Sequence, residues 1–276
     1  MSDYTRYLNQ IHDATVDVPS APPLRPPGPE PTTTGLKVID TMAPVRRGGT
    51  VEMVGPAGTG QLVVAVELLY RLGRTTNDVV CVAVGAAGEA LGSQPDLGHL
   101  TTEAGVPGPA AVILTESAAE AVQAVATAAR LAAGLAHAGA DVAMIVDEPT
   151  VLAVGAVALS EVAGVAAAGS VTVVAVRSLD TTRQLPLRLG FDTRLVFSVE
   201  EFALGIFPAI DPVQSTSRLA TSEVGDRARD HLQHGAALRQ WFSQPMFIAE
   251  GYTGEAGDWA EPAIAQRELA ELLVST

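Results

Sequence analysis

The hydrophobic positions of the chain follow two alternating patterns. In the first pattern, apolar residues recur at helical spacing, over 61–73 and over 116–138. The second pattern consists of short apolar runs that lie before, between and after these two segments. Short, unbroken apolar runs are typical of strands that are buried on both faces; they occur at 51–54, 79–84, 110–114, 142–146, 171–176 and 195–199. Buried strands that alternate with helices predict an α/β domain, in which a mostly parallel sheet carries helices on both faces.

The N-terminal part of the chain departs from this alternation. Residues 19–31 hold seven of the eighteen prolines, so we expect an extended, polyproline-like arm. The arm is either a strap along the surface of the domain or a docking arm for a partner. Residues 1–18 predict a short helix, because four apolar or aromatic residues would share one side: Tyr4, Tyr7, Leu8 and Ile11.

Composition limits the classes of partner. The chain has 276 residues, of which 47% are hydrophobic, so it can bury a sizeable core. Its net charge of −14 argues against nucleic acid and against anionic membrane surfaces, which require a basic footprint. Cys81 is the only cysteine, which excludes an internal disulfide, and its apolar neighbours predict a buried, inert thiol.

One stretch, 151–176, is apolar enough to require a membrane test. Its Ala and Gly residues favour insertion only weakly, Glu161 lies near its middle, and Gly169-Ser170 divides it. We therefore expect a buried helix or loop followed by a strand, with no direct insertion into a membrane. Residues 1–18 are polar and do not read as a signal peptide.

The most informative stretch joins the run at 51–54 to the helical pattern that begins near residue 61. Strand, glycine-rich loop and helix are the layout of a phosphate-binding loop, G-x-x-x-x-G-K-[ST]. Gln61 stands where lysine would reach the phosphates, and Leu62 stands where a hydroxyl would hold Mg²⁺. Lys37, the only lysine, lies upstream. The loop itself is intact in spacing: Gly55, Pro56, Ala57, Gly58, Thr59 and Gly60.

Asp147 is the second candidate. It follows the apolar run 142–146, downstream of the glycine loop, where phosphate-loop proteins place a carboxylate on Mg²⁺-bound water. An aspartate at the end of a strand is also common for reasons of turn geometry. We interpret it as the positional equivalent of the magnesium carboxylate.

Three stretches then resemble the β subunit of F-type ATP synthase. The first is Gly35-Leu-Lys-Val-Ile-Asp-Thr-Met-Ala-Pro, followed by Arg47-Gly-Gly and the glycine loop. The second is Gly205-Ile-Phe-Pro-Ala-Ile-Asp-Pro-Val-Gln-Ser-Thr-Ser-Arg, which resembles that family's stretch beside the adenine site. The third is Ser243-Gln-Pro-Met-Phe-Ile-Ala-Glu-Gly-Tyr-Thr-Gly, which resembles the segment that closes the same site.

The resemblance implies a RecA-like P-loop NTPase domain that belongs to a six-membered ring. It predicts a division into an N-terminal segment with the proline-rich arm (1–34), a nucleotide-binding-type domain (35–220) and a reduced helical C-terminal region (221–276). The family's N-terminal β-barrel has no counterpart before Gly35, and the C-terminal region is expected to be a short helical appendage.

The resemblance also bears on the site. The family's Val-Gly-Glu-Arg, whose Glu activates the attacking water, corresponds here to Val84-Gly-Ala-Ala, and an alanine cannot activate water. We therefore expect no catalytic residue and no metal ligand set. Two positions beside the adenine site stay aromatic, Phe207 and Tyr252, and either hold a purine or simply pack in the core.

Two functions remain open at this point. The first is a catalytically degenerate, β-like structural or assembly subunit that pairs with copies of itself or with an ATP synthase-like partner. The second is a weak ATP or ADP sensor, or a low-activity ATPase, that binds nucleotide with Mg²⁺ through a modified loop. No tightly bound cofactor and no nucleic acid are expected, and the resemblance implies a cytoplasmic protein that can be peripheral to a membrane complex.

Overall fold

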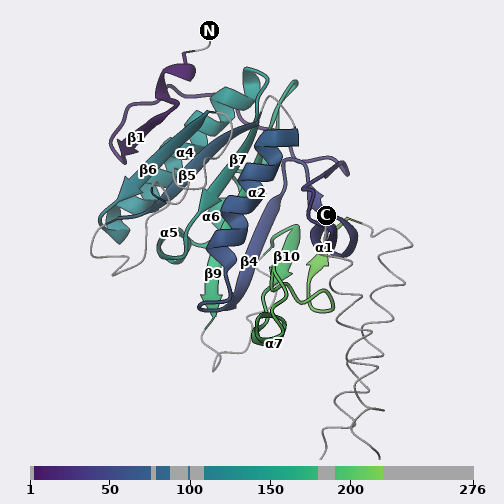
Figure 1. Cartoon of the computed structure of the whole chain (residues 1–276). Helices are drawn as coiled ribbons and strands as arrows, with labels where there is room; N and C mark the ends of the chain where they lie inside the picture. Colours follow the sequence, from purple (N-terminus) through teal and green to yellow (C-terminus); the bar gives the residue numbers. More distant parts are fainter. Residues whose placement is uncertain (1–2, 76–78, 88–98, 100–108, 180–189, 220–276) are drawn as a thin grey trace, which may run out of the picture.

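A computed structural model describes residues 3–75, 79–87, 99, 109–179 and 190–219 (Figure 1). Within these residues, the main sheet has the strand order β1-β6-β5-β7-β9-β4-β10-β11, and β8 pairs with β9 beside this path. The pairs are parallel except for β8 with β9 and β10 with β11. The strands are β1 (Gln10–Asp13), β4 (Thr50–Pro56), β5 (Val79–Ala86), β6 (Ala110–Thr115), β7 (Asp141–Val146), β8 (Gly164–Val165), β9 (Ser170–Leu179), β10 (Thr193–Val196) and β11 (Thr216–Ser217).

Helices cover both faces of this sheet, as the alternating pattern predicts. On one face, α2 (Gln61–Thr75) packs over β4 and β9 (Figure 1). On the other face lie α4 (Ala118–His137), α5 (Glu148–Val154) and α6 (Ala156–Ser160). Neighbouring residues of β7 show the division, because Ile145 joins the core under α2 and Met144 joins the core under α4. The prediction of a mostly parallel α/β domain is confirmed.

The predicted strand and helix bounds differ from the structure mainly at β10. The apolar run 195–199 does not form one strand, because β10 ends at Val196 and α7 (Val199–Ala203) follows. The hydroxyl of Ser198 accepts hydrogen bonds from the N–H groups of Glu200 and Glu201, so it caps the helix. A short helix, α1 (Lys37–Met42), forms without a clear sequence signal. A second, two-stranded antiparallel sheet pairs β2 (Pro31–Thr32) with β3 (Val45–Arg46), which follows α1.

The segment 151–176 is divided among α5, α6, β8 and the first part of β9, which confirms that it is not one continuous helix. Among the described residues, no helix combines the length and the apolarity that crossing a bilayer requires. Cys81 is buried in β5, and burial raises the pKa of its thiol to about 12, so the thiol stays protonated as expected for an inert core residue.

The prediction of a short helix over 1–18 is wrong. Among residues 3–18, the helical structure is limited to one 3₁₀ turn, η1 (Thr5–Tyr7), and Asn9 then adopts a φ of 59°, which a helix does not allow. Residues from Gln10 onward form β1, which extends the sheet by pairing in parallel with β6. Pairing with the open edge of β6 therefore outweighed the helical spacing of the apolar residues in 1–18. The strands β1 and β2 belong to different sheets, so residues 3–34 do not form a barrel.

The proline-rich arm lies along its own domain. Arg25 exchanges two backbone hydrogen bonds with Val165, each 2.9 Å from nitrogen to oxygen. At its start, the hydroxyl of Tyr4 donates to the carbonyl of Ser20. The ring of Tyr4 packs on α4 at Gly134, where a Cβ atom would lie 2.2 Å from the ring. These contacts support the interpretation of the arm as a strap rather than a free docking arm.

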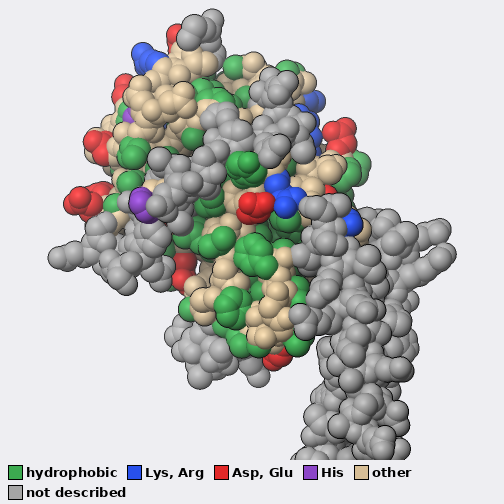
Figure 2. Space-filling view, in the orientation of Figure 1, with side chains coloured by type: hydrophobic (Ala, Val, Ile, Leu, Met, Phe, Trp, Pro, Cys, Tyr) green, Lys and Arg blue, Asp and Glu red, His purple; other side chains and the backbone are tan. Residues whose placement is uncertain are grey.

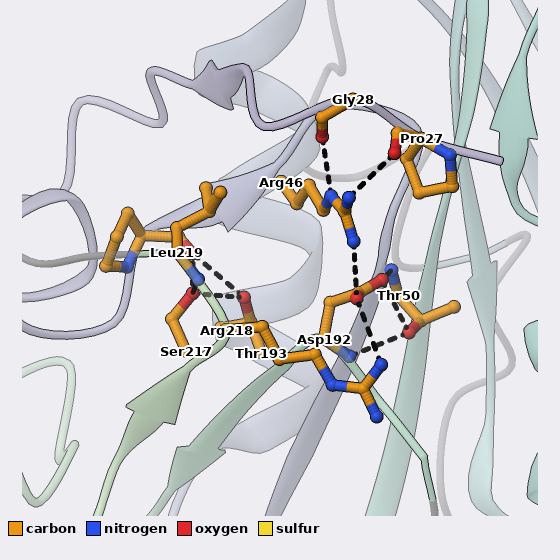
Figure 3. A network of polar contacts seen from close by, with 10 residues as sticks. Pro27, Gly28, Arg46, Thr50, Asp192, Thr193, Ser217, Arg218 and Leu219 are labelled. Atoms are coloured by element: carbon orange, nitrogen blue, oxygen red, sulfur yellow. Dashed lines mark hydrogen bonds and ion pairs between the residues drawn. The ribbon is translucent and has the colours of Figure 1, made fainter.

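Arg46 fastens the arm to the sheet (Figure 3). Its guanidinium donates to the carbonyls of Gly28 (2.5 Å) and Pro27 (2.7 Å), and on its other side it donates to Asp192 (3.1 Å). The carboxylate of Asp192 also accepts from the backbone N–H of Thr50 at 3.0 Å. One ion pair thus joins the arm, the start of β4 and the start of β10.

Replacing Arg46 by Met is expected to lower the free energy of unfolding by about 1.5–3 kcal/mol, the range for a lost hydrogen bond to a charged group. The arm should also open locally, so that trypsin cleaves after Arg25 faster than in the wild type. Urea unfolding and timed proteolysis measure both effects. The control Gln123→Met, at an exposed position of α4, should change neither quantity by much. Cleavage at the wild-type rate in Arg46→Met would show that the clamp does not hold the arm.

Candidate functional site

The glycine loop connects the end of β4 to the start of α2, as the sequence predicts. Gly58 and Gly60 have φ angles of 85° and 90°, which other residues adopt only at a cost, so both positions require glycine. The carbonyl of Gly60 accepts the first helical hydrogen bond, from Val64 at 2.9 Å. The N–H groups of the first turn of α2 have no partner within the helix by position, which is the basis of anion binding at such loops.

Gly55 is explained by packing. A Cβ atom on Gly55 would lie 2.6 Å from both the Cβ and the carbonyl oxygen of Phe197, which follows β10. The first glycine of the motif therefore permits β10 to approach β4. Thr59 is buried at the turn, where its hydroxyl donates to the carbonyl of Pro56 at 2.7 Å.

Gln61 occupies the inside of the loop. Its side-chain amide donates to the carbonyls of Gly55 (2.8 Å) and Pro56 (2.9 Å), and the residue is only 5% exposed. An amide nitrogen carries two hydrogens, so these contacts use both donors. The loop is thus closed on its own side chain, and an anion that enters the loop must displace the amide or bind outside it.

The neighbouring positions supply no ligand for a metal or for water. Leu62 is partly buried and packs against the core under α2. Ala86 is buried at the end of β5, where the family resemblance places a catalytic carboxylate. Neither side chain carries an oxygen, so neither can hold Mg²⁺ or accept a proton from water.

Asp147 is 4% exposed, and both of its carboxylate oxygens are occupied by backbone groups. One oxygen accepts from the N–H of Ala86 at 2.7 Å, and the other accepts from the N–H of Thr150 at 3.1 Å. Asp147 is therefore the N-cap of α5 and also ties the end of β7 to the end of β5. Burial raises the pKa of the carboxyl above its ordinary value, although the hydrogen bonds from Thr150 and Ala86 oppose this shift.

Phe207 lies beside the loop, as the resemblance implies. A Cβ atom on Gly60 would be 3.6 Å from the ring of Phe207, which is 49% exposed. The second aromatic candidate, Tyr252, and the whole stretch 243–254 lie outside the described residues, as does the predicted C-terminal appendage.

Besides Phe207, the half-exposed hydrophobic residues near the glycine loop and α7 are Val63, Val199, Phe202 and Leu204. Figure 2 shows hydrophobic side chains gathered over α7 and its surroundings.

These residues do not fit a magnesium nucleotide. Mg²⁺ requires oxygen ligands, but Leu62 has none, and the oxygens of Asp147 already accept backbone hydrogen bonds. The phosphate-facing amide of Gln61 is used within the loop. What persists is the backbone of a phosphate loop and one aromatic ring next to it.

A strand, a glycine loop and a helix at the carboxyl end of a mostly parallel sheet define the class: a RecA-like P-loop domain. A comparison with protein families agrees with this fold, because the model for "ATP synthase alpha/beta family, nucleotide-binding domain" matches residues 35–168. Over these residues, which make up just under half of the chain, the sequence is similar to the nucleotide-binding domain of the ATP synthase alpha/beta family. The predicted resemblance to the ATP synthase β subunit is thereby confirmed.

Two solved structures support the fold. An ATP synthase subunit, NeqB from Nanoarcheaum equitans, superposes with a TM-score of 0.70 at 17% identity, covering 88% of this chain and 73% of that chain. A prototypical ATPase from the type III secretion system of pathogenic bacteria superposes with a TM-score of 0.68 at 19% identity, covering 99% of this chain and 93% of that chain. At these identities, the similarity concerns the fold.

Proposed function

We propose that this protein is a catalytically degenerate, ATP synthase β-like subunit that serves as a structural or assembly component of a ring or complex. The observation that carries the proposal is the Gln61 amide, which is bonded to the carbonyls of Gly55 and Pro56 within the loop. A phosphate-binding loop that hydrolyses ATP needs a cation at this position to stabilise the phosphates. Here a neutral side chain satisfies the protein's own backbone instead.

The other departures from the catalytic pattern, at Leu62 and Ala86, also argue against ATP hydrolysis. Removing a single charge stabiliser from a phosphoryl-transfer site costs roughly 10³-fold or more in rate. This site combines the loss of the cation with Leu62 and Ala86, which cannot replace the magnesium ligand or the catalytic carboxylate. Such losses are not additive, but together they leave no group at these described positions that could activate water.

The assembly role rests on the fold and on the surface beside the loop. Phe202, Leu204 and Phe207 are each about half exposed, and an apolar group of this kind in a protein surface is typical of a contact with another protein. We propose that the partner is another copy of this chain or an ATP synthase-like subunit, and that the assembly is cytoplasmic and peripheral to a membrane complex.

The alternative function is a weak ATP or ADP sensor. It is favoured by the ring of Phe207 beside Gly60, where a base could stack, and by the first turn of α2, whose N–H groups suit an anion. Such a helix terminus contributes only about 0.3–1 kcal/mol to a nearby anion. Micromolar affinity corresponds to about 8 kcal/mol, so this contribution alone does not produce a sensor.

The purified chain is expected to hydrolyse Mg-ATP at the rate of a buffer blank and to form oligomers that native mass spectrometry detects, alone or with an ATP synthase-like partner. A coupled phosphate-release assay on the wild type and on Gln61→Ala separates the chain's own activity from contamination, since a contaminant does not respond to the substitution. A wild-type turnover of about 1 s⁻¹, at the low end of ordinary enzymes, that changes in Gln61→Ala would refute the proposal.

A further inference from the structure

A cavity lies at the opposite end of the strands from the glycine loop. Its volume is about 380 Å³, and it is lined by the first residues of β5, β7 and β9 and by residues of α2. The glycine loop follows the carboxyl end of β4, which runs parallel to β9. The two sites are therefore separated by the length of the sheet, and neither the resemblance nor the proposed function involves this cavity.

Most of the wall is apolar. Leu68 and Leu72 of α2 form one side, and Val79 and Val174 of the sheet contribute to the floor. Residues 31–34 also line the cavity, and among them Thr33 is exposed while Thr34 is buried. A mainly apolar wall with a few polar groups is the common design of small-molecule sites, which usually measure about 300–1,000 Å³.

The charged residues in the wall neutralise one another. Arg47 donates to both oxygens of Asp141, at 2.6 and 3.3 Å, and the hydroxyl of Ser170 donates to the same carboxylate at 2.6 Å. Glu30 approaches Arg47 at 4.0 Å from the outside. A ligand with a net negative charge would meet the carboxylates of Asp141 and Glu30, and one with a positive charge would meet Arg47. Electrostatics thus favours an uncharged ligand.

The wall also carries threonine hydroxyls, and that of Thr172 lies on the sheet, on the same face of β9 as Val174. The hydroxyl oxygen of Thr172 accepts a hydrogen bond from the N–H of Gly48 at 3.0 Å. Within the described residues, no acceptor contacts the hydroxyl hydrogen of Thr172, which can therefore donate to a ligand. A carbonyl oxygen on an otherwise apolar molecule would satisfy this donor while the rest of the molecule contacts Leu68, Leu72 and Val174.

We propose that this cavity binds a small, uncharged and mainly apolar molecule that carries one carbonyl-type acceptor. The acceptor contacts Thr172, and the apolar part lies between α2 and the sheet. Because α2 begins at the glycine loop and contributes Leu68 and Leu72 to this wall, a ligand here rests against the same helix that carries Gln61.

The test uses prodan, an uncharged naphthalene ketone whose fluorescence shifts to the blue in an apolar site, titrated into the full chain. Saturable binding at one molecule per chain is expected. Thr33→Trp, which places a bulky ring at an exposed position of the cavity lining, should weaken binding at least tenfold. Thr172→Val, which removes only the hydroxyl, should weaken it about three- to tenfold, the effect of one neutral hydrogen bond.

Two control variants keep the result interpretable. Gln123→Trp adds the same ring at an exposed position of α4 and should bind prodan like the wild type. Phe207→Ser alters the apolar surface beside the glycine loop and should also have no effect. Thermal unfolding checks that Thr33→Trp remains folded. Absence of saturable binding, a loss in Phe207→Ser that equals the loss in Thr33→Trp, or wild-type affinity in both cavity variants would overturn the proposal.

Discussion

The double variant Gln61→Lys, Leu62→Thr is expected to bind Mg-ATP at least tenfold more tightly than the wild type. For the wild type, isothermal titration calorimetry should give a dissociation constant no lower than about 1 mM, which corresponds to about 4 kcal/mol. The variant removes the amide that bonds to Gly55 and Pro56, and it introduces an ammonium group that can reach the phosphates. One charge-assisted hydrogen bond contributes about 1.5–3 kcal/mol, or roughly 10- to 150-fold in affinity.

The single variants show which change matters. Gln61→Lys alone should provide most of the gain, because Leu62 faces the core and its exchange adds only a hydroxyl. The control Gln123→Lys adds the same charge on the exposed face of α4. Any gain in Mg-ATP affinity in this control would come only from making the net charge of −14 less negative. If the double variant gains nothing over Gln123→Lys, the loop does not open and the likeness to a nucleotide site is architectural. A wild-type constant in the low micromolar range would instead favour the sensor.

Hydrolysis should stay at background in the double variant even if binding improves. Ala86 still stands where the family's carboxylate activates water, and a methyl group cannot accept a proton. This separation of binding from turnover tests the interpretation of Ala86 independently of Gln61. Measurable turnover in the double variant would mean that another residue supplies the base.

The sequence was sufficient for the parts of the fold that depend on burial. The apolar runs marked the central strands, and α4 was found over nearly its full length, because an entirely buried strand or a long amphipathic helix leaves a pattern that few alternatives share. The pattern was less reliable at surfaces. Val122 fits the helical spacing of α4 but is 57% exposed, since a single apolar residue on a helix costs little in contact with water.

The rest depended on contacts between distant residues. The edge of β6 converted residues 10–13 into a strand. The sequence also did not predict a buried ion-pair cluster on the sheet. In this cluster, Glu52 of β4 pairs with Arg177 at 2.7 Å and with Arg194 at 3.3 Å. A glutamate within an apolar strand was its only signal. The glycine loop was recognised, but the bonds of Gln61 to the loop carbonyls could not be inferred from spacing alone.

Asp147→Ala is expected to be among the most destabilising single substitutions at the candidate site, at about 2–4 kcal/mol. It removes the N-cap of α5, which usually costs about 0.5–2 kcal/mol. It also leaves the buried N–H of Ala86 without its acceptor, which costs about 1–3 kcal/mol. Urea unfolding measures the loss. Asp147→Ser should recover part of it by capping Thr150, and the exposed Asp3→Ala should have little effect. A loss under 0.5 kcal/mol, the ordinary range of surface changes, would contradict this structural role.

The pH dependence of that loss distinguishes burial from hydrogen bonding at Asp147. Burial is the largest influence and raises the pKa of the carboxyl above the ordinary value of 3.8. A carboxyl whose pKa is raised by folding contributes most to stability when it is protonated, below the unfolded pKa, and loses that contribution as the pH rises through the folded pKa. The difference in unfolding free energy between the wild type and Asp147→Ala should therefore be largest below pH 3.8 and shrink as the pH rises through the raised pKa. If the difference grows with pH instead, the hydrogen bonds from Ala86 and Thr150 outweigh burial, and the carboxylate is the form that the fold stabilises.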